Sequence, residues 1–447
     1  MSTDWGSVPP PVVEPGDLPP EPARTPLRVL HVLTKFEDGA GGNTLVSATG
    51  MDPARYEVWI VGSEGGPLWE LAERAGIRTV PLANLHRELS PLADLRALAR
   101  LVRIIRGGRF TVVHAHNAKG GFLGRLAAWL CGTPVVVYTL HGRDPWWRTS
   151  DSGERLLGED MSRSQRLMYL AMERALRPVT DAFVAVAPRV ARDAVESGIA
   201  PAGKVRVAPS ALDLDAVPYA PDPTARLDLG IPADTPLVGT VGRLGAQKAP
   251  LDFVRMARIV ARARPDARFV WVGRGPLMEA ARAEAQRLGV EVTFTGYRPD
   301  AARIASTFDV YVVSSLYEGV GRSLTEALAS GRPVVATAVD GVADVVVHGA
   351  TGLLASARDP SGLAERVTWM LDHPAAAQRM GRQGRGFVRS LFAQSELCGR
   401  LDRLYSDLLG LPPASAGTQL ARESPAGPNG SGRSRHPLPF PSPSLHG

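Results

Sequence analysis

Cysteine is nearly absent from this sequence: Cys131 and Cys398 are the only two among 447 residues, and they lie far apart. Two thiols are too few for a disulfide framework, and they cannot form a zinc site. Such low cysteine usage suits a reducing compartment. We therefore expect a cytoplasmic protein without a bound metal.

Long apolar runs are missing as well. No stretch reaches the roughly 20 residues that a membrane-spanning helix needs, and the first residues lack the positive-then-apolar pattern of a signal peptide. The expected location is the cytoplasm, either free or on the inner face of the cell membrane.

Aromatic residues are scarce, at 6%, and there is no zinc-finger spacing, no aromatic RNA-binding signature and no long basic block. These absences argue against nucleic acid as a partner. The net charge is nevertheless +6, and most of the positive charge is arginine, which grips phosphate groups in a bidentate way. A phosphorylated small molecule is the expected ligand.

The order of apolar runs predicts two domains. A chain with 44% hydrophobic residues and this length can fill two cores. Short runs rich in valine and isoleucine alternate with helical patterns, which is typical of βαβ units on parallel sheets. The first series of expected strands is 27–34, 56–61, 110–115, 135–139 and 182–187, with helices at 91–106 and 119–131. The second series is 237–241, 268–272, 290–294, 310–313 and 334–336.

Composition also predicts where the domains begin and end. Residues 1–26 and 412–447 are rich in proline, and we expect them to be disordered tails. The expected parts between the tails are a first domain at 27–212, a proline-rich linker at 213–234, a second domain at 235–390 and a helix at 391–411 that packs back on the first domain. Loops at the carboxyl ends of parallel strands converge, so the space between two such sheets is a natural ligand site.

Two carboxylates flank a glycine turn directly after the expected strand 310–313. The stretch begins with 318–322 (EGVGR) and reaches its second glutamate at Glu326. The glycines let a ligand approach the backbone, and the amides that open the following helix suit an anion. Carboxylates accept hydrogen bonds from sugar hydroxyls. Either glutamate alone is better explained as a turn or surface residue, so the interpretation depends on a second motif.

That second motif is 242–248 (GRLGAQK), which follows the expected strand 237–241. Arg243 and Lys248 leave the same strand end, and with the amides of the next helix they can neutralise a diphosphate leaving group without a metal. Taken alone, these two residues could equally be surface residues of a loop. Their place in the same expected sheet as the glutamate pair favours a shared functional site.

Together these motifs resemble the retaining GT-B glycosyltransferases of family four, also called group 1, and the resemblance covers about 27–408. It implies an α/β fold of GT-B architecture, in which two doubly wound Rossmann-like domains face a cleft. It further implies that Arg243 and Lys248 hold the donor diphosphate, that Glu326 holds the ribose hydroxyls and that Glu318 contacts the transferred sugar. The remaining donor-binding residues of the turn would be Val320, Gly321 and Arg322.

Other elements match the same family. Gly41 and Gly42, before a helix expected to start at Asn43, resemble its amino-terminal glycine loop near the donor phosphates. His141, at a strand end, resembles the histidine that contacts the sugar, although a lone histidine is more often structural. The resemblance makes His141 a catalytic residue together with Glu318, Arg243 and Lys248.

The base and the acceptor have their own candidates. Residues 294–303 resemble the loop that cups the nucleotide base, which implies donor contacts from Arg298 and Arg303. The run 113–125 resembles members that build bacterial surface polysaccharides on lipid carriers, and it places His116 and Lys119 near the acceptor. A solvated helix start explains Lys119 equally well. The last two acceptor candidates are Trp146 and Trp147. They lie in an expected loop, where their side chains would suit the rim of an acceptor site or a membrane contact.

The sequence also departs from the family pattern. Arg322 and Ser323 stand where hydrophobic residues are common, which leaves the donor sugar open, and 339–341 (VDG) with Asp344 replaces a usual Gly-Gly and Glu. The D-x-D at 213–215 lies in the linker and predicts a turn. Residues 273–275 (GRG) lack the full dinucleotide-binding pattern, so a dehydrogenase is disfavoured.

The resemblance implies a hexosyltransferase that retains anomeric configuration and acts in surface polysaccharide or glycolipid synthesis. It would need no cofactor beyond its nucleotide diphosphate sugar, with a UDP-sugar favoured over a GDP-sugar. Its other partner would be a sugar or lipid-linked acceptor, with peripheral membrane contact through the basic amphipathic helix 91–106. Two alternatives stay open, a nucleotide-sugar epimerase or hydrolase on the same fold and a catalytically silent nucleotide-sugar-binding module.

Overall fold

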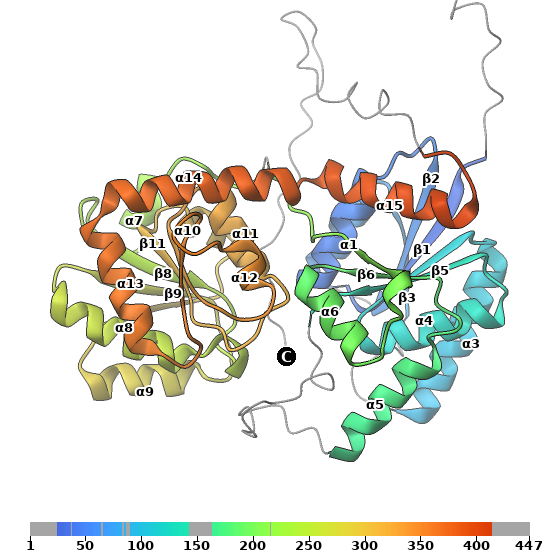
Figure 1. The fold of residues 1–447 in the computed structure, drawn as a ribbon, viewed down its shortest axis with the longest axis horizontal. Coiled ribbons are helices and arrows are strands. Elements are labelled where there is room, and N and C mark those ends of the chain that lie inside the picture. Colours follow the sequence, from blue (N-terminus) through green and yellow to red (C-terminus); the bar gives the residue numbers. More distant parts are fainter. Residues whose placement is uncertain are drawn as a thin grey trace, which may run out of the picture.

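A computed structural model of the protein describes residues 25–36, 38–63, 66–82, 85, 90–142, 163–214 and 216–413. Two parallel sheets, each covered by helices, lie side by side and form the GT-B architecture (Figure 1). The predicted α/β fold class is confirmed. Most of the two predicted tails lies outside the described residues.

The first sheet has seven parallel strands in the order β3-β2-β1-β4-β5-β6-β7. They are β1 (Leu27–Lys35), β2 (Tyr56–Ser63), β3 (Arg78–Pro81), β4 (Val112–His116), β5 (Val135–Leu140), β6 (Ala182–Ala185) and β7 (Val205–Val207). The helices of this domain are α1 (Asp38–Gly50), α2 (Pro67–Arg74), α3 (Pro91–Gly108), α4 (Ala118–Leu130), α5 (Arg163–Ala175) and α6 (Pro188–Glu196), with a short 3-10 turn η2 (Ala202–Lys204). The strand order reverses between β1 and β4, which is where such sheets bind ligands.

The second sheet has six parallel strands in the order β10-β9-β8-β11-β12-β13. They are β8 (Leu237–Val241), β9 (Arg268–Val272), β10 (Thr293–Gly296), β11 (Val310–Val313), β12 (Val334–Thr337) and β13 (Leu353–Ala355). The helical elements are η3 (Ala246–Lys248), α8 (Pro250–Ala263), α9 (Met278–Leu288), α10 (Ala301–Ala305), α11 (Arg322–Ala329), α12 (Val342–Val345), α13 (Pro360–Asp372) and α14 (Pro374–Leu391). Here the order reverses between β8 and β11.

Alternation along the strands of the first sheet sorts side chains to its two faces. In β1, Val29 and Leu33 enter the core beneath α1 and α2, whereas Leu30 and Val32 enter the core beneath α3. His31 falls on the same face as Val29 because it is two residues further along the strand. This period of two also puts histidines of β4 on that face.

Two connections join the domains. Among its described residues, the linker contains one short helix, α7 (Pro223–Leu227), since its prolines prevent a longer one. Helix α15 (Gln394–Leu409) continues the line of α14 across both domains (Figure 1) and packs on α1, where the Tyr56 hydroxyl donates to Asp402 at 2.8 Å. The backbone N–H of Leu212 donates to the Phe392 carbonyl at 2.8 Å, which fixes the crossing point.

Most boundaries lie within two residues of the sequence-based expectation, but β10 begins three residues away from it and α1 five. The strand expected at 290–294 is β10 at Thr293–Gly296, because Val290 instead packs in the core at the end of α9. Helix α1 begins at Asp38 rather than at Asn43, so a glycine-rich stretch forms its first turns. Within the part of the chain that the structure describes, no helix combines the length and the apolar character needed to cross a bilayer.

Candidate active site

The two motifs of the second domain lie side by side at the reversal point of its sheet. β8 pairs with β11, so the loops that leave their carboxyl ends are neighbours. The Leu316 N–H donates to the Gln247 carbonyl at 2.7 Å, and the Ser314 hydroxyl donates to the Lys248 carbonyl at 2.7 Å. The Gln247 amide in turn donates to the Tyr317 carbonyl at 3.1 Å. These bonds join the 242–248 loop to the glutamate turn as one structural unit.

Lys248 and Glu318 form an ion pair in this unit. Their side chains are 20% and 7% exposed, so the pair is largely shielded from water. The Ser315 hydroxyl donates to the same Glu318 carboxylate oxygen at 3.1 Å, and the Glu318 N–H donates to the Asp340 carboxylate at 3.1 Å. The Lys248 ammonium and the Glu318 carboxylate therefore neutralise each other within this unit.

Asp340 holds the glutamate turn from the neighbouring loop. It is buried and has a φ of 35°, a left-handed conformation that favours glycine. Asp340 thus holds a strained backbone conformation while its carboxylate accepts the bond from Glu318. Asp344, four residues on, accepts from the Arg189 N–H of α6 at 3.1 Å and so links the two domains.

Glu326 pairs with Arg322 one turn earlier on α11. The Arg322 Nε donates to Glu326 at 2.9 Å, and the two side chains are 16% and 15% exposed. The other end of Arg322 reaches the first domain, because a Cβ placed on Gly42 would lie 2.9 Å from its Nη1. Arg322 thus connects Glu326, the residue predicted to hold the ribose, with Gly42 of the predicted amino-terminal glycine loop.

The amide groups that open α11 are suited to an anion. Gly321 precedes the helix with a φ of 88°, which only glycine adopts readily, and the first turn has no preceding carbonyls to accept its N–H groups. Val320 is buried beside this turn, whereas Arg243 is exposed and its guanidinium makes no hydrogen bond or ion pair with the described residues. The turn before α11 therefore offers backbone donors, and the joined 242–248 loop offers an exposed guanidinium.

Close backbone contacts bring the first domain against this loop. A Cβ on Gly319 would lie 2.4 Å from the His141 carbonyl oxygen, and one on Gly142 would lie 3.4 Å from the Gly319 Cα. Gly41 packs against Phe36 and Leu68 in the first turns of α1. The expectation that both glycines precede a helix start is therefore wrong, although Gly42 does face the second domain.

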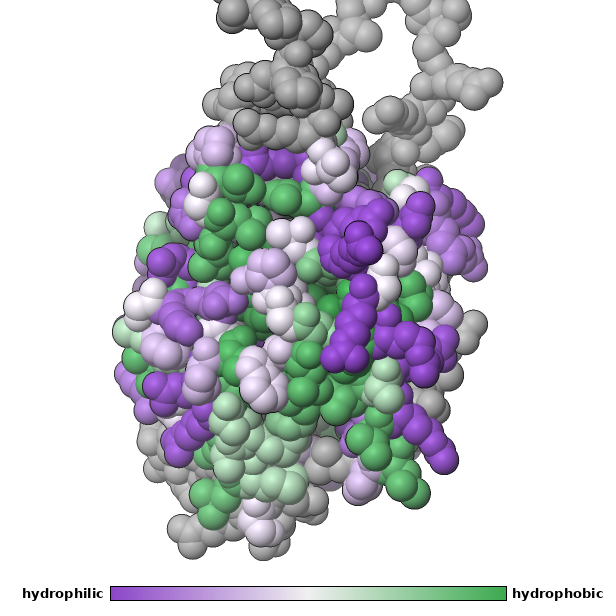
Figure 2. Space-filling view, turned by 90° about the vertical axis from the view of Figure 1, so that its right-hand side faces the viewer, coloured by the Kyte–Doolittle hydropathy of each residue, from purple (hydrophilic) through white to green (hydrophobic). Residues whose placement is uncertain are grey.

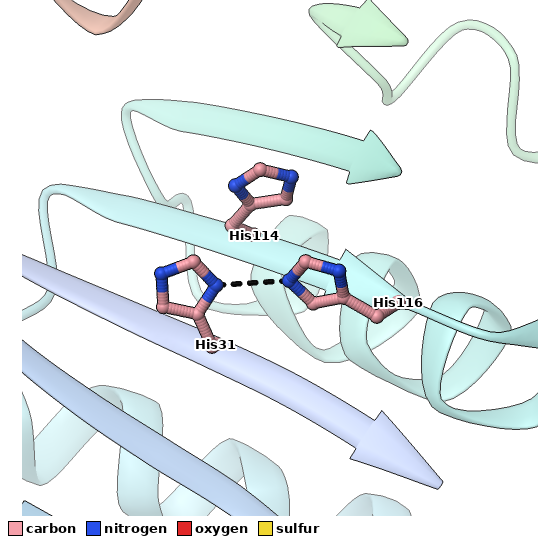
Figure 3. A group of neighbouring side chains, drawn as sticks. All are labelled: His31, His114 and His116. Atoms are coloured by element: carbon pink, nitrogen blue, oxygen red, sulfur yellow. Dashed lines mark hydrogen bonds between the residues drawn. The ribbon is translucent and has the colours of Figure 1, made fainter. Parts of the chain in front are cut away.

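His141 belongs to a group of four imidazoles at the centre of the first sheet. His31 of β1 and His114 and His116 of β4 are almost completely buried and stack with ring centroids 4.5–5.1 Å apart (Figure 3). His116 bonds His31 at 2.8 Å through Nε2 and His141 at 3.0 Å through Nδ1. His114 instead bonds Tyr405 of α15 and Thr139 of β5, each at 2.6 Å.

This arrangement changes the role expected for His116. The side chain is 2% exposed and both ring nitrogens already have histidine partners, which argues against direct contact with an acceptor. The sequence signal that identifies the group is the H-x-H alternation of β4, but the partner on β1 becomes visible only with the strand order.

Burial also sets the charge of these rings. It lowers the pKa of His31 to about 3 and that of His141 to about 4. Burial, followed by the neighbouring imidazoles, lowers the pKa of His114 and His116 well below 6.5. Three of the rings are close enough to consider a metal ion, yet stacked rings direct their lone pairs along separate planes rather than toward one point. At neutral pH the group is a set of neutral, hydrogen-bonded imidazoles.

The two arginines expected at the nucleotide base are already engaged. Arg298 makes two hydrogen bonds to Asp300, at 2.7 and 2.8 Å. Arg303 pairs with Asp228, Asp300 and Asp222, and these carboxylates raise the pKa of its guanidinium. Arg303 thereby fastens α10 to the linker, and its contact with the nucleotide base stays a prediction.

Lys119 lines a separate pocket between α3, α4 and α5. Its ammonium pairs with Asp94 at 2.7 Å, and its side chain is only 8% exposed. The pocket is lined mainly by apolar side chains, among them Phe122, Leu123 and Met172. Trp146 and Trp147 lie outside the described residues.

Comparison with known proteins gives consistent matches to both halves of the chain. The family model "Glycosyl transferases group 1" matches residues 235–373, and "Glycosyl transferase 4-like domain" matches residues 39–211. A 2-deoxystreptamine N-acetyl-D-glucosaminyltransferase of Streptomyces fradiae is 32% identical over 68% of this chain and 75% of its own. The UDP-Gal:alpha-D-GlcNAc-diphosphoundecaprenol alpha-1,3-galactosyltransferase of Escherichia coli is 28% identical over 79% of this chain and 90% of its own.

Solved structures give the same fold. The crystal structure of the HepE protein of Anabaena in complex with UDP and glucose has a TM-score of 0.70 and 19% sequence identity. The match covers 85% of this chain and all of that protein. At this identity the likeness concerns the fold alone.

Proposed function

Because this chain belongs to the glycosyl transferases group 1 family, we propose that it moves a hexosyl group from a nucleotide diphosphate sugar to an acceptor hydroxyl with retained anomeric configuration. The observation that carries the proposal is the pair of joined loops at the β8–β11 reversal point, where Lys248, Glu318, Arg322 and Glu326 lie in two ion pairs beside the exposed Arg243. No other cofactor enters the proposal.

The donor fits this site by exchange of partners. The diphosphate would replace carboxylates as the partner of Lys248 and Arg322, and the amides at the start of α11 would add donors. Glu318 and Glu326 would then be free to accept hydrogen bonds from the sugar and ribose hydroxyls. A UDP-sugar is the favoured donor, which agrees with the UDP bound in the HepE structure and the UDP-Gal named for the E. coli relative.

In the proposed reaction the acceptor hydroxyl attacks the anomeric carbon from the side on which the diphosphate leaves. A phosphate oxygen takes the hydroxyl proton, so no protein base is required. Arg243 and Lys248 stabilise the charge that develops on the leaving group, in a site already organised by the loop hydrogen bonds. His141, beside Gly319, would contact the transferred sugar.

The first domain supports an acceptor carried on a lipid at a membrane surface. Leu92 and Leu95 of α3 are 72% and 64% exposed, and Leu167 of α5 is 62% exposed. Exposed arginines follow on α3, and hydrophobic and hydrophilic areas are interleaved on the outer side of this domain (Figure 2). Apolar side chains among cations suit anionic headgroups. The proposed setting is therefore surface polysaccharide or glycolipid synthesis on the inner face of the cell membrane.

The experiment is a thermal-shift panel of nucleotide sugars, followed by product analysis with soluble and lipid-linked acceptors. We expect one donor to stabilise the protein and to be consumed only with an acceptor. Lys248→Met should remove both effects, while Arg262→Met, at an exposed position in the last turn of α8, should keep them. Free epimerised sugar or hexose without acceptor would instead identify an epimerase or a hydrolase, and binding without turnover would identify a silent module.

A further inference from the structure

We propose that His31 and His116 are positioning residues that fix His141 in the tautomer with its proton on Nδ1, so that His141 offers an N–H donor to the transferred sugar. The inference rests on the proposed function only for the identity of that ligand. The arrangement of the three rings stands on its own geometry.

The three rings form one hydrogen-bonded chain from the centre of the sheet to its carboxyl edge. Nδ1 of His31 lies 2.8 Å from Nε2 of His116, and Nδ1 of His116 lies 3.0 Å from Nε2 of His141. His31 comes from β1 and His116 from β4, the two strands between which the sheet order reverses. The chain therefore ends at the edge where the second domain contacts His141 through Gly319.

Neutral imidazoles make this chain directional. Each neutral ring has one N–H and one acceptor nitrogen, so each of the two contacts has a single donor. His116 uses both nitrogens, and it must donate through one and accept through the other. The proton positions on the three rings are consequently linked, and only two arrangements are compatible with both bonds.

The free nitrogen of His31 decides between the two. Its Nε2 makes no hydrogen bond to any of the described residues, and the side chain is 1% exposed. One arrangement leaves the unpaired N–H at Nε2 of His31, which is almost completely buried, and the other leaves it at Nδ1 of His141, which is partly exposed. An N–H is less costly where water or a ligand can accept from it, so the second arrangement is favoured. His31 therefore carries its proton on Nδ1 and donates to His116. His116 then donates from Nδ1 to Nε2 of His141, which leaves the His141 proton on Nδ1.

His114 supports the chain without joining it. Its ring stacks on both His31 and His116, and its own nitrogens bond the hydroxyls of Tyr405 and Thr139. A hydroxyl can donate or accept by rotating, so these partners adapt to either tautomer of His114. The stack holds the ring planes of the chain, and α15 reaches the site through Tyr405.

The direct test is the nitrogen-15 spectrum of the histidine side chains in the full-length protein labelled with 15N-histidine, at pH 7. The shifts and couplings of the ring nitrogens separate the two neutral tautomers from the charged form, and single substitutions assign the signals. We expect His116 and His141 to be neutral with the proton on Nδ1. The proposal would be overturned by a proton on Nε2 of His141 or by a charged ring. It would also be overturned if a chelator removed a stoichiometric metal and changed these signals.

Paired variants test whether the chain matters to the reaction. His31→Asn places an amide donor where Nδ1 of histidine stands, whereas His31→Leu removes the donor, and His373→Asn on the second domain is the control. We expect His31→Leu to mix the tautomers of His141 and to lower kcat about tenfold with little change in the donor KM, and His31→Asn to restore both. Equal loss in both variants, or loss without a tautomer change, would mean a structural role alone.

The two kinds of failure are distinguishable. The tautomer spectrum requires no turnover, so it can contradict this inference while sugar transfer is observed. Conversely, if no nucleotide sugar is bound or consumed, the proposed function fails and the spectrum still reports the state of the chain.

Discussion

Replacing Gly319 by alanine would insert one methyl group at the contact between the two domains. Gly319 does not adopt a positive φ, so alanine brings no backbone strain there. The new Cβ would lie 2.4 Å from the His141 carbonyl oxygen and 3.3 Å from the Gly142 Cα. Both neighbours are backbone atoms, which cannot turn aside as a flexible side chain would. The domains must separate or the loop must move.

The size of the displacement follows from the contact distance. Real Cβ contacts seldom fall below 3.4 Å, so the 2.4 Å separation requires a movement of about 1 Å. A misplacement of this size at a reacting centre lowers rates by about 100-fold, equivalent to about 2.7 kcal/mol of transition-state stabilisation. The ion-paired donor site lies within the second domain, so the affinity for the donor nucleotide should change far less.

The assay compares kcat/KM for sugar transfer with the calorimetric affinity for the nucleotide in three variants. Gly142→Ala meets only an ordinary contact, at 3.4 Å, and Gly386→Ala in α14 meets no atom within 4 Å. Both should remain near wild type. If Gly319→Ala transferred sugar at the wild-type rate, the close approach of the two domains would not matter to the reaction.

Three further outcomes follow from the same geometry. Glu326→Gln should weaken nucleotide binding about tenfold through the ribose, measured by calorimetry, and an unchanged affinity would contradict that assignment. The buried stack of His31, His114 and His116 stays neutral when folded but takes up protons when unfolded, because its pKa values lie below 6.5. The free energy of unfolding should therefore be constant above pH 6.5 and fall below it, by about 1.4 kcal/mol per pH unit for each ring. Equal free energies of urea unfolding at pH 7 and pH 5.5 would refute this. Glu173→Ala should lower the free energy of unfolding by about 3–5 kcal/mol, because it leaves the fully buried Arg125 without the carboxylate that lies 2.6 Å away. A decrease below about 1 kcal/mol in chemical denaturation would contradict this expectation.

Local patterns were sufficient to predict most of the second domain. The strands at 237–241, 268–272 and 310–313 are confirmed at both ends, because each is a short apolar run enclosed by turn or charged residues. The predicted start of β10 was wrong because Val290, which follows the end of α9, packs in the core instead of pairing in the sheet. The start of α1 was wrong because glycine disfavours helices in isolation, whereas the packing of Gly41 against Phe36 and Leu68 requires it here.

Long-range partners were beyond the reach of sequence patterns. The E-x7-E spacing located both glutamates, but it could not indicate that Lys248 and Arg322 form ion pairs with them. The candidate His116 was near the site, yet its partner on β1 depends on the strand order of the sheet. Arg303 was predicted to contact the base because residues 294–303 resemble the base-binding loop of the family. Its ion pairs with carboxylates of the linker depend on the folded chain and could not be predicted from the sequence.

The most direct test of the proposed chemistry is the anomeric configuration of the product. A nucleotide sugar with an α-linked hexose would be supplied with the acceptor found in the panel, and the coupling constant of the anomeric proton would be read by NMR before any equilibration. We expect an α-linked product, because the acceptor attacks on the side from which the diphosphate leaves. A β-linked product would contradict it, since that outcome requires attack from the opposite side.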